Sequence, residues 1–135
     1  MICFIDFETT GIDVFKDNPI EIGAVLINSE GVITKKFHSL IKPRTNRIAS
    51  KAAFKTHGIE VNNLIIAPTQ EEVLKSFFEE FGTEFRFAGW NINFDVSFFR
   101  RMCHNANKMR EFNKINHRHI DVQTIKYLAV ELNIL

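Results

Sequence analysis

The chain has 135 residues, of which 45% are hydrophobic and 24% are charged, and its formal net charge is +1. This composition excludes a disordered chain and suits a single globular domain, which we place at residues 1–135. No apolar run has the length of a transmembrane helix, and Met1 is not followed by a signal-peptide pattern. Cys3 and Cys103 form neither a disulfide framework nor a paired zinc motif. We therefore expect a cytoplasmic protein that does not contact a membrane.

The small net charge conceals an uneven distribution. Residues 35–55 contain Lys and Arg but no acid, and residues 100–118 contain a single acid, Glu111, among several basic residues. The acids concentrate between Glu71 and Glu84. Such segregation fits either a basic surface for a polyanion such as nucleic acid, or simply two solvated faces.

Three strands are predicted in the first third of the chain. Residues 3–11 form an apolar run that ends at Gly11, which is typical of a strand buried on both faces. A second strand is predicted over 19–28, and a third over 32–43, ended by Pro43. The turn signal at residues 28–31 predicts antiparallel pairing of these two strands.

The remaining chain alternates between predicted helices and strands. A short helix is predicted over 48–56, and a clearer one over 69–81, with Thr69 as N-cap and Gly82 after its end. A short strand at 85–91, a helix at 93–104, a strand at 117–122 and a helix at 122–132 follow. Three strands followed by an αβαβα order predict an α/β sandwich.

Asp6 and Glu8 stand out because they interrupt the apolar first strand. Side chains alternate along a strand, so these two carboxylates leave the same face side by side, while Ile5 and Phe7 pack on the other. Unpaired like charges in such a place cost several kcal/mol, on the order of 2–7, unless a cation lies between them.

Asp95 is predicted to be a third inward carboxylate. At helical spacing it shares a face with Phe98, Phe99 and Met102, although it could instead only favour the first helical turn or cap its own helix. Clustered carboxylates suit Mg²⁺ or Mn²⁺, and two such ions can activate water for hydrolysis of a phosphodiester. The pattern therefore predicts phosphoryl transfer to water, with the polyanion of the basic segments as substrate.

Six segments resemble, in order, the DEDD superfamily of 3′-to-5′ exonucleases, which includes the epsilon subunit of DNA polymerase III and ribonuclease T. F-I-D-F-E-T-T-G is similar to the first motif, and W-N-I-N-F-D to the second. P-I-E-I-G-A-V, F-H-S-L-I-K-P, T-H-G-I and H-I-D-V-Q-T resemble the intervening and following segments. The resemblance implies a ribonuclease H-like α/β fold, with a five-stranded mixed sheet flanked by helices.

The resemblance also implies roles for individual residues. Asp6 and Glu8 would bind two Mg²⁺ or Mn²⁺ ions, and Asp95 would support the second ion, partly through water. Contacts to the terminal nucleotide are implied for Thr9, Thr10, Gly11, His57, Asn91 and Phe94. His57 could equally be a surface histidine before a glycine turn. The implied reaction releases nucleoside 5′-monophosphates from single-stranded DNA or RNA 3′ ends, in proofreading or repair, and the sequence does not separate DNA from RNA.

The chain departs from the family pattern at two places. Trp90 stands where the second motif usually carries a histidine. The third motif, a histidine followed five residues later by an aspartate, supplies the general base and the fourth carboxylate, and it does not occur in these 135 residues. We thus expect a domain that lacks the last helices of the family and exposes apolar surface, which a partner or a second copy of the chain could cover.

Other residues could stand in for the third motif or form a different site. His117 and His119 precede Asp121 by four and two residues rather than five, so we interpret them as structural or at most accessory. A zinc site from Cys103, His104, His117 and His119 fits no standard spacing. Without the base, the alternative to an active exonuclease is a catalytically impaired nucleic-acid-binding or interaction module.

Overall fold

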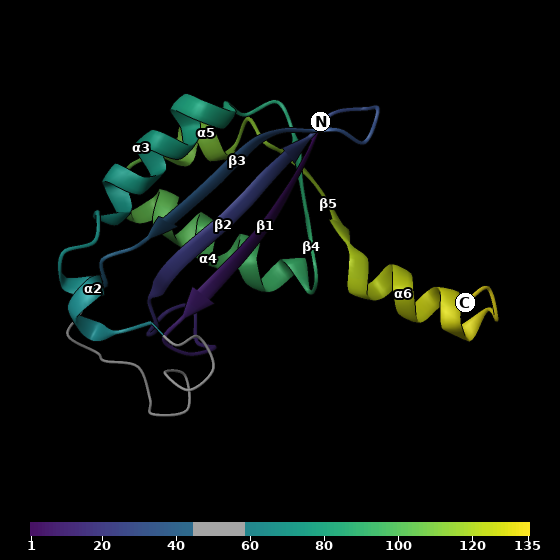
Figure 1. Cartoon of the computed structure of the whole chain (residues 1–135), viewed down its shortest axis with the longest axis horizontal. Helices are drawn as coiled ribbons and strands as arrows, with labels where there is room; N and C mark the ends of the chain where they lie inside the picture. The colour runs from purple at the N-terminus through teal and green to yellow at the C-terminus, as the bar shows by residue number, and fades with distance from the viewer. Residues whose placement is uncertain (45–58) are drawn as a thin grey trace.

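A five-stranded mixed sheet forms the centre of the molecule in the computed structural model, which describes residues 1–44 and 59–135 (Figure 1). The strands are β1 (Ile2–Thr9), β2 (Pro19–Ile27), β3 (Ile33–Leu40), β4 (Arg86–Gly89) and β5 (Asn116–Asp121). They lie in the order β3-β2-β1-β4-β5. The first three strands pair antiparallel, whereas β4 runs parallel to β1 and β5 runs parallel to β4. The predicted mixed five-stranded sheet is confirmed.

The helices pack mainly against one face of this sheet. They are α2 (Val61–Ile65), α3 (Gln70–Phe81), α4 (Ile92–Asn105), α5 (Met109–Phe112) and α6 (Val122–Glu131). Figure 1 shows α3, α4 and α5 behind the strands, whereas α6 extends away from the sheet. The short helices α2 and α5 were not predicted. The helix predicted over 48–56 lies outside the described residues, as does His57.

The prediction that β1 is buried on both faces is wrong. Cys3, Ile5 and Phe7 are buried on the helix-covered face, but Asp6 is exposed, and Phe4 and Glu8 are only partly covered. The same alternation continues on β2, because the antiparallel register places Ile5 beside Ala24 and Asp6 beside Gly23. One face of the sheet therefore belongs to the core, and the other is largely open to solvent.

The core consists largely of phenylalanine. Phe77 of α3 lies at its centre and is fully buried. Five phenyl rings have centroids within 6.2 Å of the Phe77 ring, namely Phe37, Phe78, Phe81, Phe85 and Phe99. Edge-to-face and tilted pairs of this kind stabilise a core beyond the area they bury. Phe99 also pairs with Phe7 of β1 and Phe87 of β4, so the rings hold α3 and α4 against β1, β3 and β4.

The predicted start of α3 at Thr69 is confirmed by a reciprocal capping box. The Thr69 hydroxyl accepts a hydrogen bond from the Glu72 backbone N–H at 3.3 Å, and Glu72 Oε2 accepts one from the Thr69 N–H at 2.8 Å. These bonds satisfy two backbone donors that a helix start otherwise leaves unpaired.

Helix α6 differs from the other long helices, α3 and α4, because none of its side chains is buried. Ile125, Leu128 and Leu132 lie on one side, as the sequence predicts, but each is more than half exposed. Across the described residues, no helix is both long and apolar enough to span a membrane.

Candidate active site

Two carboxylates leave the open face of β1 side by side. Asp6 and Glu8 alternate with the buried Ile5 and Phe7, so the strand geometry alone fixes their common direction. Asp6 and Glu8 lie on one face of β1 as predicted, but that face is more open to solvent than expected.

Asp95 joins them from α4. It is only 3% exposed, and its Oδ1 accepts a hydrogen bond of 2.8 Å from the backbone N–H of Phe7, the residue between Asp6 and Glu8. The bond is possible because β1 pairs with β4 only from Ile2 to Phe4, which leaves the Phe7 N–H outside that ladder. The helix thus brings the third carboxylate to the strand that carries the other two.

The turn before α4 sets this approach. Asn91 has a φ of 53°, in the left-handed region that asparagine tolerates better than most residues. Its backbone N–H donates to Asp121 Oδ1 at 3.1 Å. Gly89, at the end of β4, lies close to β1, since a Cβ there would be only 3.0 Å from the Ile5 carbonyl oxygen. The chain can therefore turn tightly from β4 into α4 beside β1.

All three carboxylates have a raised pKa. Burial raises the pKa of Asp95 to about 7, with the charges of Asp6 and Glu8 adding to the effect and the Phe7 N–H opposing it. Partial loss of solvent raises the pKa of Asp6 and of Glu8, and nearby carboxylates raise both further. Negative charge is therefore concentrated at this site and weakly compensated, which is typical of functional sites and of cation sites.

Glu21 is a fourth carboxylate that sequence reasoning missed. The register of β1 and β2 places it directly beside Glu8, and its charge raises the pKa of both Asp6 and Glu8. Its Oε1 also lies 2.6 Å from Nε2 of His38 on β3. The signal in the sequence was a lone acid between Ile20 and Ile22, but only the strand register shows which residue it faces.

The loop after β1 is held by hydrogen bonds. The Thr10 hydroxyl donates to Asp17 Oδ1 at 3.2 Å and accepts from the Asn18 N–H at 2.8 Å, and Thr10 is buried. The Thr9 hydroxyl donates to the Gly11 carbonyl oxygen at 2.6 Å. A Cβ at Gly11 would collide with the Asp17 carboxylate, whose Cγ would lie 2.6 Å away. These residues shape the loop beside Glu8, with the Thr10 side chain directed into the protein.

The other predicted residues are distributed around the start of α4 and the end of β5. Phe94 is partly buried, with its ring centroid 5.0 Å from that of Phe98. Asp121 is the N-cap of α6, because its Oδ1 accepts from the Gln123 N–H at 3.0 Å. The His119 ring lies against Phe87, with centroids 6.0 Å apart, and burial together with His117 lowers its pKa. These contacts are structural.

The donor atoms of the site suit a hard divalent cation in type and charge, since carboxylate oxygens are the ligands that Mg²⁺ and Mn²⁺ prefer. As placed, however, no three His, Cys, Asp or Glu side chains in the described part of the chain converge closely enough to hold a metal ion. One oxygen of Asp95 already accepts from Phe7, which leaves Oδ2 for a ligand. Asp6 is exposed and Glu8 is partly exposed, so both carboxylates are accessible from solvent.

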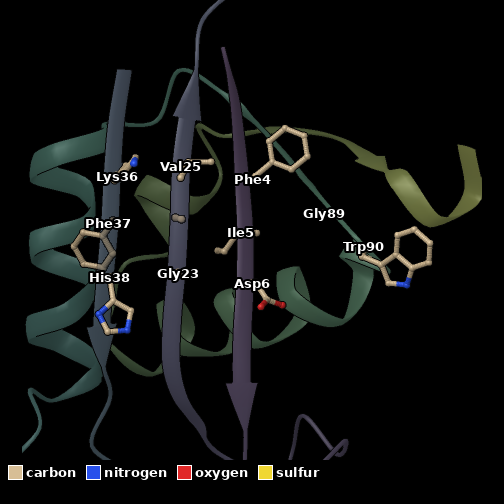
Figure 2. Close-up of a pocket in the computed structure, with 11 residues that line it drawn as sticks. Phe4, Ile5, Asp6, Gly23, Val25, Lys36, Phe37, His38, Gly89 and Trp90 are labelled. Atoms are coloured by element: carbon tan, nitrogen blue, oxygen red, sulfur yellow. The ribbon is translucent and has the colours of Figure 1, made fainter. Parts of the chain in front are cut away.

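A groove of about 760 Å³ runs across the open face beside this site. It reaches from Lys36 and His38 on β3, over Gly23, to Asp6 and Trp90 (Figure 2). The register places His38, Gly23 and Asp6 in one row across three strands. Because Gly23 has no side chain and no neighbour within 4 Å of its Cβ position, the centre of the row is open.

Comparison with known proteins matches this arrangement to a family. The family described as exonuclease (RNase_T) matches residues 3–134. The chain belongs to this exonuclease family. The DEDD-type resemblance of the motifs is thereby confirmed, and the chain is a hydrolase domain by family.

Curated relatives and solved structures agree with this assignment. PolC-type DNA polymerase III of Thermotoga petrophila is 41% identical over 96 residues, which cover 71% of this chain and 7% of that protein. The DNA polymerase III epsilon subunit of Aquifex aeolicus is 35% identical over 97 residues, which cover 72% of this chain and 46% of that protein. The chain thus spans less than half the length of these relatives.

Solved structures share the fold. An apo exonuclease I superposes with a TM-score of 0.81 at 17% identity, over 96% of this chain and 30% of that one. Exonuclease I of E. coli in complex with a dT13 oligonucleotide superposes with a TM-score of 0.69 at 19% identity. The match covers 78% of this chain and 24% of that one. The ribonuclease H-like exonuclease fold predicted from the motifs is confirmed.

Proposed function

We propose that this domain is the catalytic core of a 3′-to-5′ exonuclease that hydrolyses the terminal phosphodiester bond of a single-stranded nucleic acid. The observation that carries the proposal is the meeting of Asp95 with β1, through the Phe7 N–H, between Asp6 and Glu8. Three carboxylates of raised pKa gathered at β1 support a site for divalent cations and phosphoryl chemistry.

Asp6, Glu8 and the Oδ2 atom of Asp95 would hold two Mg²⁺ or Mn²⁺ ions. Such ions activate water and stabilise the charge that develops on the scissile phosphate. The protein residues contribute orientation. The Phe7 N–H fixes the Asp95 carboxylate, and the loop formed by Thr9, Thr10 and Gly11 shapes the surface that receives the terminal nucleotide.

A second candidate function is nucleic-acid binding without cleavage. Two observations favour it for these 135 residues. No histidine is followed five residues later by an aspartate, and the described carboxylates do not converge as placed. A missing general base typically lowers the rate about 10²- to 10⁴-fold. The isolated domain should therefore cleave slowly even if it binds substrate.

The two candidates separate in a cleavage assay with the 135-residue protein, a 3′-labelled oligonucleotide and Mn²⁺. The exonuclease proposal expects slow release of nucleoside 5′-monophosphates, which Asp6→Ala and Asp95→Ala abolish. Glu30→Gln, an exposed carboxylate in the β2–β3 turn, is the matched control and should retain the activity. Wild-type protein that binds the oligonucleotide but leaves it intact would establish the binding module instead.

Metal affinity gives a second readout that does not depend on cleavage. Isothermal titration with Mn²⁺ should show binding to the wild type and to Glu30→Gln. Asp6→Ala should abolish binding, because the variant removes a ligand and makes the site less negative. Unchanged Mn²⁺ affinity in Asp6→Ala would contradict the assignment of the ligands.

A further inference from the structure

Trp90 lies at the edge of the groove, and it occupies a motif position at which the family usually has a histidine. Trp90 and Tyr127 are the single tryptophan and the single tyrosine of the chain. They come from different elements, the β4–α4 turn and α6, yet their ring centroids are 6.5 Å apart at an interplanar angle of 65°. Both remain accessible, with exposed fractions of 51% and 57%. Contiguous exposed apolar side chains often mark a site of interaction.

A network centred on Asp121 holds the two rings together. Its Oδ1 accepts from the Asn91 N–H, adjacent to Trp90, and from the Gln123 N–H at the start of α6. Its Oδ2 accepts from the Thr124 hydroxyl at 3.1 Å. One carboxylate therefore ties the turn that carries Trp90 to the helix that carries Tyr127, so the aromatic pair is preorganised.

Positive charge accompanies the aromatic pair. The Lys126 ammonium nitrogen lies 5.4 Å from the centroid of the Trp90 ring. Lys36 and His38 line the opposite side of the same groove, and Asp6 lies between the two sides (Figure 2). An exposed aromatic ring beside a cation, in a groove with further basic groups, is the combination that stacks a base and contacts its phosphate.

We propose that Trp90 and Tyr127 form a stacking platform for a base of the single-stranded substrate, with Lys126 contacting the adjoining phosphate. This inference rests on the proposed function and adds a substrate-positioning site to it. Because Trp90 and Asp6 line one groove, a base held on the platform would place its strand next to the carboxylates. Stacking accepts every base, so the platform would give affinity without sequence preference.

The test measures binding in EDTA, where metal-dependent cleavage cannot interfere. Since Trp90 is the sole tryptophan, addition of an oligothymidylate should quench the tryptophan emission of the wild-type protein directly. In fluorescence anisotropy with a labelled oligonucleotide, Trp90→Ala should weaken binding about 5- to 100-fold, the range expected for one stacked base. Trp90→Phe should retain most of the affinity, because a phenyl ring also stacks.

Two controls isolate stacking from charge and from general exposure. Phe15 lies on the β1–β2 connection and is another exposed aromatic ring, in contact with Arg101 of α4, so Phe15→Ala should leave affinity unchanged. An abasic oligonucleotide keeps the phosphates and should lose the dependence on Trp90. Lys126→Ala should lower the salt dependence of binding by about one phosphate contact.

Equal binding by wild type and Trp90→Ala, or equal binding of abasic and thymidylate strands, would overturn the platform. So would a tryptophan emission that changes with protein concentration but not with oligonucleotide, which indicates an interface between copies. Failure of the platform and failure of the proposed exonuclease function give different results. Weaker binding by Trp90→Ala in a protein that never cleaves supports the platform alone. Cleavage that requires Asp6, with binding indifferent to Trp90, supports the exonuclease alone.

Discussion

Asp95 shows how one buried side chain links stability to chemistry. An ordinary aspartate has a pKa near 4, whereas burial raises that of Asp95 to about 7. The folded protein therefore binds a proton more tightly than the unfolded chain. This favours folding at low pH, and the contribution is lost as the pH rises from about 4 to 7. A bound divalent cation would displace this proton, so metal affinity should rise over the same range.

We predict that Asp95→Asn reduces this pH dependence. Asparagine keeps an oxygen for the Phe7 N–H but carries no charge, so the free energy of unfolding of the variant should fall less between about pH 4 and 7. The difference should be on the order of a few kcal/mol at the upper end. Urea denaturation at several pH values measures it, with Glu30→Gln as the control. An identical slope for wild type and Asp95→Asn would contradict the assignment.

Two glycines in neighbouring parts of the sheet should respond oppositely to alanine. Gly23 of β2 faces open space, whereas a Cβ at Gly89 of β4 would lie 3.0 Å from the Ile5 carbonyl oxygen and 3.1 Å from Ile92 Cδ1. Gly23→Ala should stabilise the fold by about 0.4–1 kcal/mol, because it restricts the unfolded chain without a clash.

Gly89→Ala should destabilise the fold by about 1–3 kcal/mol, since β1 or the start of α4 must shift. Thermal denaturation of the two variants side by side gives the comparison. A destabilised Gly23→Ala protein would mean that this face of the sheet is covered in solution.

At the scale of elements, α3 depends on its capping box. Thr69→Ala removes the hydroxyl that accepts from the Glu72 N–H and should lower the free energy of unfolding by about 1 kcal/mol. Ser76→Ala, at an exposed position within the same helix, should leave it unchanged or slightly higher. Chemical denaturation of both variants tests the cap, and equal effects would rule it out as a stabilising contact.

Secondary structure could be predicted where a local signal decides it. The Thr69 and Glu72 side chains satisfy the backbone of their own helix, and Gly82 follows its end, so α3 was located correctly from sequence. The short helices α2 and α5 have no buried amphipathic stripe, and nothing in their local pattern marked them. Their formation depends on neighbours that the local sequence does not reveal.

At the scale of the whole molecule, stability should differ between the core and α6. The α4 helix buries Phe98, Phe99 and Met102 in the core, whereas α6 buries no side chain. Native-state hydrogen exchange should therefore show amides in the middle of α4 opening only with global unfolding, and those of α6 exchanging through local opening. Equal protection of the two helices would mean that α6 is packed against another surface in solution.

Local sequence patterns were enough to predict the five strands, the long helices α3, α4 and α6, the common face of Asp6 and Glu8, and the inward direction of Asp95. These depend on side-chain period and on contacts within one element, which a local pattern contains. The folded structure was needed to show that one face of β1 is open, that Asp95 accepts from the Phe7 N–H, and that Glu21 lies beside Glu8. It also brought Trp90 to Tyr127. Each of these depends on strand register or helix docking between segments distant in the chain, where the physical determinant is packing of the whole core.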